Sequence, residues 1–223
     1  MKRIVSIAVL LFTLISLSAH PWKPRHYVIV DTDGGIDDLK TLCMLLASPD
    51  VKVLAVTTSD GYIKADDAYA TVRKMADDLW HEGLMIAKKD DAVSLIEKVL
   101  SPETSPVTFV ALGSLQTAAD ALGNAPSFTV KVKQIVWSND DLTGKEGFNY
   151  RSSPDAARKV LDGPLPIVVT RGGADKFYTD SLIEQIEGIN TPYASMVCDL
   201  IAKRSDHPFV FTAYDEMVPL FLH

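Results

Sequence analysis

The sequence has only two cysteines among 223 residues, too few for a disulfide-stapled scaffold, and no Cys/His run has the spacing of a zinc site. Lys and Arg are outnumbered by Asp and Glu, which gives a formal net charge of −7. The chain therefore lacks the basic surface that binds nucleic-acid backbones, and no nucleic acid is expected as a partner. With 47% hydrophobic and 23% charged residues, it can form a full core.

One long apolar run lies at the N-terminus. Lys2 and Arg3 precede the apolar residues 4–17, and Ser18-Ala19 follow them. This order is typical of a secretory signal peptide with a small-residue cleavage site. The run is shorter than the roughly 20 residues that a membrane-spanning helix needs. We expect residues 1–19 to be removed and the mature protein, residues 20–223, to be periplasmic or secreted as a single domain without stable membrane insertion.

Export would place Cys43 and Cys198 in an oxidising compartment. Both lie in apolar, helix-forming contexts, which favours buried free thiols. A disulfide between them is the alternative.

Apolar β-branched runs alternate with amphipathic stretches along the rest of the chain. The runs predict strands at 27–31, 51–57, 83–87, 107–112, 130–137 and 165–170. Helices are expected at 37–47, 64–79, 92–100, 114–122, 153–161, 181–187 and 194–204. This alternation predicts an α/β fold: a doubly wound, mostly parallel sheet with helices on both faces. A ligand should then bind beyond the carboxyl ends of the strands.

The strongest chemical signal is an acidic turn directly after the first strand. Four carboxylates, from Asp31, Asp33, Asp37 and Asp38, fall within eight residues of this turn. They would repel one another at short range unless a hard divalent ion, Ca²⁺ or Mg²⁺, joined them. The alternative is an acid-rich first helical turn without a metal. An EF-hand is excluded, because its twelfth position would be Leu42 where a Glu is needed.

The same turn resembles the D-T-D-x-G-x-D-D signature of the inosine/uridine-type nucleoside hydrolases. The resemblance keeps its order and spacing over residues 27–170. The segments that carry it are 30–38, 46–49, 54–58, 109–119, 135–137, 147–149 and 153–157. In this family, a water on a Ca²⁺ ion attacks the anomeric carbon of a ribonucleoside or related riboside.

The resemblance implies a role for each matching residue. The Ca²⁺ ligands would be Asp33, Asp38, the main-chain carbonyl of Gln116, and Asp215. Asp33 would also be the general base, and Asp37 and Asn149 would bind the sugar. Asp206 is a rival for the C-terminal ligand, but the apolar residues after Asp215 favour the latter. Family members are commonly oligomeric, so a homo-oligomer is a further expectation.

Three positions depart from the family pattern. Gly147 replaces a Glu, Tyr62 an Asn, and Tyr214 a His that could donate a proton to the leaving base. These departures leave two main hypotheses: an exported, Ca²⁺-dependent hydrolase of N-glycosyl bonds, or a catalytically impaired binding module that keeps the metal site. An Asp-nucleophile phosphatase is a third, minor alternative, because Asp31-x-Asp33 also follows a strand.

Overall fold

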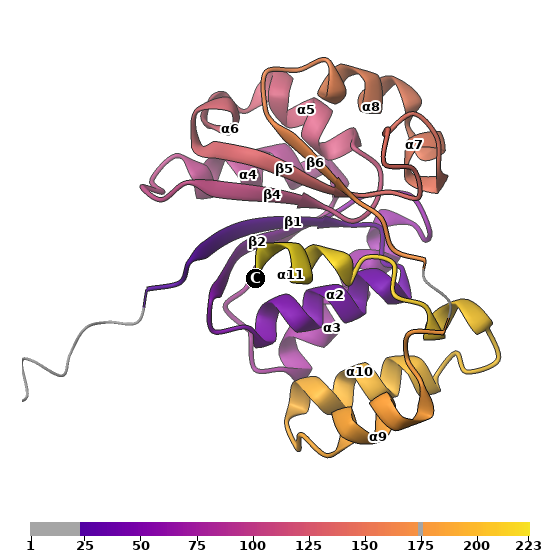
Figure 1. The fold of residues 1–223 in the computed structure, drawn as a ribbon. Helices are drawn as coiled ribbons and strands as arrows, with labels where there is room; N and C mark the ends of the chain where they lie inside the picture. Colours follow the sequence, from indigo (N-terminus) through magenta and orange to yellow (C-terminus); the bar gives the residue numbers. More distant parts are fainter. Residues whose placement is uncertain (1–22, 174–175) are drawn as a thin grey trace, which may run out of the picture.

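The computed structural model describes residues 23–173 and 176–223, and the predicted signal peptide lies outside them. Six parallel strands form one sheet in the order β3-β2-β1-β4-β5-β6 (Figure 1). The strands are β1 (His26–Thr32), β2 (Val51–Thr58), β3 (Met85–Ala87), β4 (Val107–Ala111), β5 (Val132–Ser138) and β6 (Ile167–Thr170).

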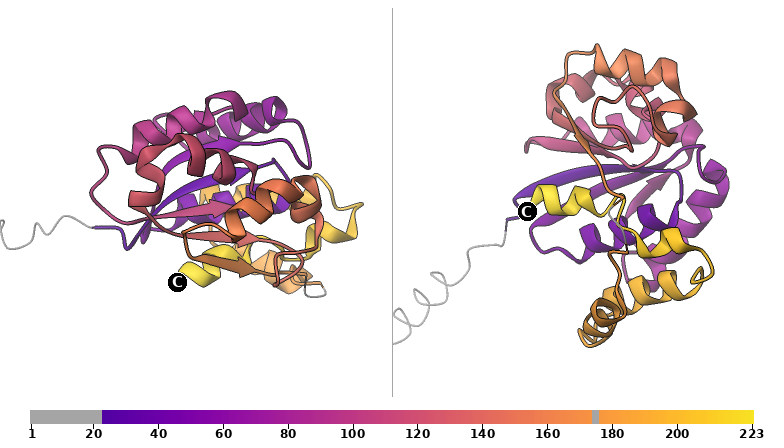
Figure 2. Two further views of the ribbon diagram at one scale, coloured as in Figure 1. Left: turned by 90° about the horizontal axis from the view of Figure 1, so that it is seen from above. Right: turned by 45° about the vertical axis from the view of Figure 1, so that its right-hand side comes forward.

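Helices cover both faces of the sheet (Figures 1 and 2). One face packs against α2 (Ile36–Ala47), α3 (Ala65–Asp78) and α11 (Met217–Leu222), while α10 (Pro192–Ala202) packs on α2 and α9 (Asp180–Glu187) packs on α10. The other packs against α4 (Ala92–Leu100), α5 (Gln116–Asn124), α6 (Pro126–Lys131) and α8 (Pro154–Leu161). Three short helices, η1 (Lys89–Asp91), α7 (Phe148–Ser152) and η2 (Pro208–Phe211), lie in the connections.

The apolar strands are continuous because both faces are buried. In β1, Val28 and Val30 belong to one core and Ile29 to the other, since neighbouring side chains in a strand point to opposite faces. The α/β prediction with a doubly wound parallel sheet is therefore confirmed.

Several predicted bounds differ from the structure by about two residues, and some short helices were not expected. The strand expected from residue 130 begins at Val132, because Pro126 starts the short helix α6 and Lys131 ends it. The helix α7 was not expected, since five residues carry too little periodicity to be recognised.

The strand order reverses between β1 and β4, which places a switch point at their carboxyl ends. Loops leave the two strands in opposite directions there and open a crevice, where ligands of such folds bind. The acidic turn follows β1 directly, so the fold places it at this crevice.

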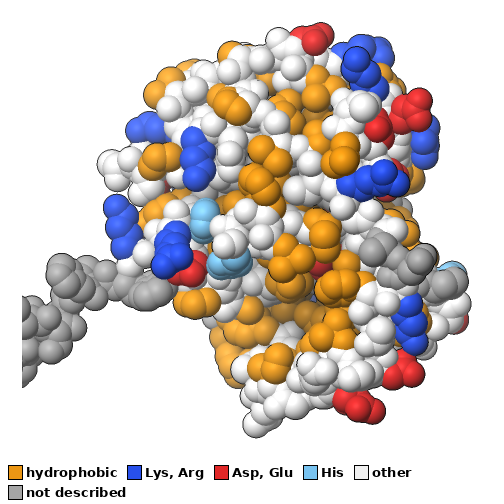
Figure 3. Space-filling model, viewed as in Figure 1, with side chains coloured by type: hydrophobic (Ala, Val, Ile, Leu, Met, Phe, Trp, Pro, Cys, Tyr) orange, Lys and Arg blue, Asp and Glu red, His pale blue; other side chains and the backbone are white. Residues whose placement is uncertain are grey.

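An apolar groove lies elsewhere on the surface, between α2, α9 and α10. Figure 3 shows the apolar side chains gathered over these helices, in the lower half of the view. Cys43 is buried beside the groove, Cys198 is partly exposed, and both thiols are free. Within residues 23–173 and 176–223, no helix is long and apolar enough to cross a membrane.

Candidate active site

A pocket of about 380 Å³ opens at the carboxyl ends of β1, β4 and β5. This volume lies in the usual range for small-molecule sites. The lining combines acidic, amide and aromatic side chains: Asp33, Gly35, Asp37, Asp38, Tyr62, Leu112, Ser138, Asn139, Asp140, Phe148, Asn149, Gly172, Phe209, Tyr214 and Asp215.

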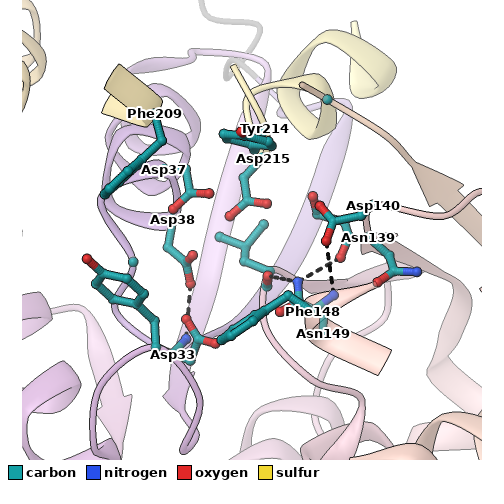
Figure 4. A pocket seen from close by; sticks show the side chains of 15 residues that line it. Asp33, Asp37, Asp38, Asn139, Asp140, Phe148, Asn149, Phe209, Tyr214 and Asp215 are labelled. Carbon is teal, nitrogen blue, oxygen red and sulfur yellow. Dashed lines mark hydrogen bonds between the residues drawn. The ribbon is translucent and has the colours of Figure 1, made fainter. Parts of the chain in front are cut away.

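Three carboxylates meet in this pocket. Asp37 and Asp38 come from the first turn of α2, and Asp215 comes from the segment before α11. Each offers one oxygen, and the three oxygens lie within 4.8 Å of one another. Figure 4 shows the three side chains close together, with Asp33 beneath Asp38.

The turn before α2 holds Asp38 in place. The Thr32 hydroxyl donates to Asp38 Oδ2 at 2.6 Å, and the Asp33 N–H donates to the same oxygen at 3.0 Å. The positive φ of Gly34, +81°, allows the chain to fold back so tightly. The local sequence therefore aims Asp38 into the pocket.

The cluster lacks a compensating charge at its centre. Burial, followed by the charge of neighbouring carboxylates, raises the pKa of Asp38 and of Asp215 well above the ordinary value. Asp215 Oδ2 is buried and has no hydrogen-bond partner among the residues that the structure describes. An unsatisfied buried oxygen beside two more carboxylates suits a hard cation with oxygen ligands, so these residues fit a Ca²⁺ or Mg²⁺ ion.

Asp33 lines the same pocket from the end of β1. Burial raises the pKa of its carboxyl, and the backbone of Tyr62 and of Gly35 opposes this rise in part. The backbones of Gly61 and Gly113 also approach this carboxyl so closely that an added Cβ would lie 2.0 and 3.0 Å from its Oδ2. Two glycines thus make room for Asp33, which lies outside the three-carboxylate group.

No protein-family model matches the chain, but individual proteins do. The pyrimidine-specific ribonucleoside hydrolase RihA of Salmonella schwarzengrund is 25% identical over 78% of this chain and 70% of its own length. The inosine-uridine preferring nucleoside hydrolase of Bacillus anthracis superposes with a TM-score of 0.69, at 17% identity over 88% of this chain and 81% of that one. A purine-preferring ribonucleoside hydrolase from Gardnerella vaginalis gives a TM-score of 0.68, at 18% identity over 86% of this chain and 78% of that one.

The chain is a divergent relative of the nucleoside hydrolases. The family predicted from the acidic turn and the segments after it is therefore confirmed. The three relatives share a nucleoside substrate in their names but differ in the base.

The structure groups these residues differently from the ligand set implied by the nucleoside hydrolase resemblance. Asp37, expected to bind sugar, belongs to the three-carboxylate group, whereas Asp33 does not. Gln116 begins α5 and lines a separate pocket, so its carbonyl is not brought to the cluster and stays a predicted ligand. Its side chain bonds to Asp120 and Ser153, and helix geometry directs its carbonyl along α5.

Leu112 lines the pocket just after β4, and its main-chain carbonyl is a candidate for the role expected of Gln116. It accepts a hydrogen bond from Asn149 Nδ2 at 2.7 Å, and the same nitrogen donates to the Ser138 carbonyl at 2.9 Å. Asn149 therefore ties the ends of β4 and β5 together, and its Oδ1 remains for a ligand.

Two other acidic residues lie outside the pocket. Asp31 turns away from it and accepts hydrogen bonds from the hydroxyls of Thr57, at 2.6 Å, and Ser59, at 2.9 Å. Asp206 is exposed and pairs with the neighbouring His207. Of the two C-terminal candidates, the structure thus brings only Asp215 to the cluster.

The aromatic lining was not predicted as a unit. Tyr62, Phe148, Phe209 and Tyr214 reach the pocket from four different segments. Figure 4 labels the last three. Tyr62 and Tyr214 stand out in the sequence as departures from the family pattern, and Phe148 lies in the matching segment 147–149, but nothing marks Phe209. The four rings form apolar walls against which a flat heterocycle can stack.

Gly61→Ala tests the close approach to Asp33. The new Cβ would overlap Asp33 Oδ2 and displace the carboxyl, and a displacement of this size lowers kcat by about 10²-fold. Gly83→Ala is the matched control, since nothing lies within 4 Å of its added Cβ. Steady-state kinetics on nucleosides would check this, and equal rates for both variants would contradict it.

A second prediction concerns pH and the metal-free protein. Burial raises the pKa of Asp33 to about 6 and of Asp31 to about 7, from an ordinary 3.8. Each of these carboxyls has a higher pKa in the folded protein than in the unfolded protein. Its contribution to stability is fully present below the unfolded pKa and is lost as pH rises through the folded pKa. We expect the melting temperature of chelated protein to fall by about 5 °C as pH rises from 3.8 to about 7, and by less with Ca²⁺. Calorimetry would check it, and a flat metal-free profile would contradict it.

Proposed function

We propose that the protein is a Ca²⁺-dependent hydrolase of the N-glycosidic bond of ribonucleosides, exported to the periplasm or secreted. The observation that carries the proposal is the meeting of Asp37, Asp38 and Asp215 beside Asp33, in an aromatic-walled pocket at the switch point of the sheet. The similarity to nucleoside hydrolases in sequence and fold supports the reaction class. The N-terminal sequence pattern supports export.

Asp37, Asp38, Asp215 and the Leu112 carbonyl would hold the cation, and Asp33 remains a predicted fifth oxygen donor at the pocket edge. All are hard oxygen donors, the ligand type that Ca²⁺ prefers. When bound, the ion supplies positive charge that makes a neighbouring water more acidic.

Asp33 serves as the general base in this proposal. Burial raises its pKa to about 6, close enough to neutrality for a carboxylate to accept a proton efficiently. Its carboxyl takes the proton of the attacking water, while the surrounding carboxylates stabilise the positive charge that develops on the sugar. Asn149 donates both its Nδ2 hydrogens to backbone carbonyls, so in this proposal its Oδ1 accepts a hydrogen bond from a sugar hydroxyl.

The leaving base would lie between the aromatic walls. The hydroxyl of Tyr214 is a donor in the pocket, next in sequence to Asp215, and can protonate or hydrogen-bond the departing base. The Tyr214 ring packs over Gly173, whose added Cβ would lie 3.3 Å from Tyr214 Cε1. This contact orients the ring toward the pocket.

A specific observation favours a second candidate, a binding module with the same metal site. Gly147 carries no carboxylate, and an added Cβ there would lie 2.6 Å from Asn139 Oδ1, so the site has no room for the larger side chain of the family. Tyr62 is 43% exposed, so this wall of the pocket is open to water. Both features weaken substrate enclosure, on which hydrolysis depends more than binding does.

The test measures ribose release from purine, pyrimidine and nicotinamide ribosides by the mature protein. Each riboside is assayed with Ca²⁺, with chelator, and with Asp38→Ala; Asp155→Asn, whose side chain is 95% exposed on α8, is the matched control. Turnover that requires both Ca²⁺ and Asp38 would support the hydrolase. Ca²⁺ binding without any turnover would favour the binding module instead.

A further inference from the structure

A lysine is fully buried beneath the three carboxylates. Lys40 lies in α2, one turn after Asp37, and its side chain is 0% exposed. Its Nζ lies 2.6 Å from Glu216 Oε1 and donates to the carbonyls of Val210, at 3.1 Å, and Thr212, at 3.4 Å. The three N–H donors of the ammonium group thus have three oxygen partners.

The partner of Lys40 is equally enclosed. Glu216 is 1% exposed, and its Oε1 also accepts a hydrogen bond from the Tyr178 hydroxyl at 2.7 Å. Its Oε2 accepts one from the Tyr214 N–H at 2.9 Å. The Tyr178 ring lies 4.3 Å from Lys40 Nζ. Such a pair is tolerated in a core because every charged atom is hydrogen-bonded, and removing one partner leaves a buried charge unpaired.

The network joins two parts of the chain that are 170 residues apart. One end is α2, whose first turn carries Asp37 and Asp38. The other end is the segment 210–216, which carries Asp215. The helix η2 ends at Phe211 and α11 begins at Met217, so the residues between them have no regular secondary structure. The backbone of this segment is held before Asp215, by Lys40 at Val210 and Thr212 and by Glu216 at Tyr214. After Asp215, the side chain of Glu216 is held by Lys40.

We propose that Lys40, acting through Glu216 and the carbonyls of Val210 and Thr212, is a positioning residue that sets Asp215 against Asp37 and Asp38 for cation binding. The inference rests on the metal site of the proposed function. Lys40 itself touches neither the cation nor the substrate. Lys40 determines whether the carboxylate of Asp215 lies beside those of Asp37 and Asp38.

Simple electrostatics predicts the opposite effect of removing Lys40. Its positive charge acts on Asp37, as does the negative charge of Glu216. Removing a nearby positive charge should tighten the binding of a divalent cation. If Lys40 instead positions Asp215, its removal should weaken that binding. The sign of the change in Lys40→Met therefore separates positioning from a charge effect. A variant that also lacks Glu216 keeps the net charge of the pair, so hydrogen exchange without metal provides the separation there.

The experiment is Ca²⁺ titration calorimetry on the full mature chain, with wild type, Lys40→Met, and the double variant Lys40→Met/Glu216→Met. The double variant leaves no unpaired buried charge, so it remains folded even if the single variant does not. We expect both to bind Ca²⁺ roughly 10–100-fold more weakly than wild type, as is typical when the supports of metal ligands are lost. Lys74→Met removes the same charge from the exposed face of α3 and should leave affinity unchanged.

A readout without metal completes the test. In the chelated double variant, amide hydrogen exchange of residues 210–217 should accelerate by about tenfold or more, with α8 unchanged. Phe128→Leu, in the core of the opposite face, controls for general destabilisation and should keep its Ca²⁺ affinity.

The outcomes separate the two proposals. Unchanged or tighter Ca²⁺ binding by the double variant, or equal exchange in residues 210–217, overturns the positioning role alone. An equal loss of affinity in Phe128→Leu does the same. Absence of Ca²⁺ binding by wild type overturns the metal site itself, and with it both proposals.

Discussion

Asp33→Asn should lower kcat by roughly 10²–10⁴-fold, the usual contribution of a general base. The substitution keeps the shape of the side chain and its fit between Gly61 and Gly113, but an amide cannot accept the proton of the attacking water. Since Asp33 lies outside the three-carboxylate group, Ca²⁺ affinity should fall far less than kcat.

Kinetics with nucleosides and Ca²⁺ calorimetry on the same protein would check this separation. Asp155→Asn, the same chemical change on the exposed surface of α8, should match wild type in both. If Asp33→Asn loses Ca²⁺ binding as completely as activity, Asp33 is a principal ligand, as the family resemblance implies. Wild-type kcat in this variant would exclude it as the base.

Asp215→Asn should change metal affinity and metal-free stability in opposite directions. Ca²⁺ affinity should fall by about 10²-fold or more, because the site loses one of three clustered negative charges. Without metal, the same loss relieves repulsion among buried carboxylates and leaves no charge on the buried Oδ2 position. The melting temperature of the chelated protein should then rise by about 2–4 °C for each kcal/mol gained.

Calorimetric titration and scanning calorimetry would check the two halves. Asp206→Asn is a suitable control. Asp206 is exposed, lies between α10 and η2, and is outside the pocket. A variant that is destabilised without metal would show that the Asp215 carboxylate is needed for packing. Retained Ca²⁺ affinity would remove Asp215 from the ligand set.

The local part of the site could be predicted because it is contiguous in sequence. Asp33, Asp37 and Asp38 follow one buried strand within six residues, and a strand that runs into a helix has few conformations open to it. Thr32 and Gly34 then direct Asp38 inward through bonds that span at most six residues. The placement of these carboxylates therefore depends on short-range geometry that the residue pattern carries.

The sequence is least informative about a main-chain ligand such as the one predicted at Gln116. A main-chain carbonyl is present at every residue, so the sequence does not mark the one that faces the pocket. The turn from β4 into α5 decides this. In the structure Leu112, directly after the strand, lines the pocket, and Gln116 at the start of the helix does not.

The sequence by itself determined the parallel α/β fold, the edge of the sheet where a ligand binds, and the acidic turn at that edge, because periodicity and strand–helix order are local properties. Only the tertiary structure decided that Asp31 faces away, that four aromatic residues form the walls, and that Lys40 pairs with Glu216 under the cluster. Nothing in the residues near Lys40 predicts its partner. Packing removes both charges from water. In the core, each charge is stable only beside the other, so the two residues pair.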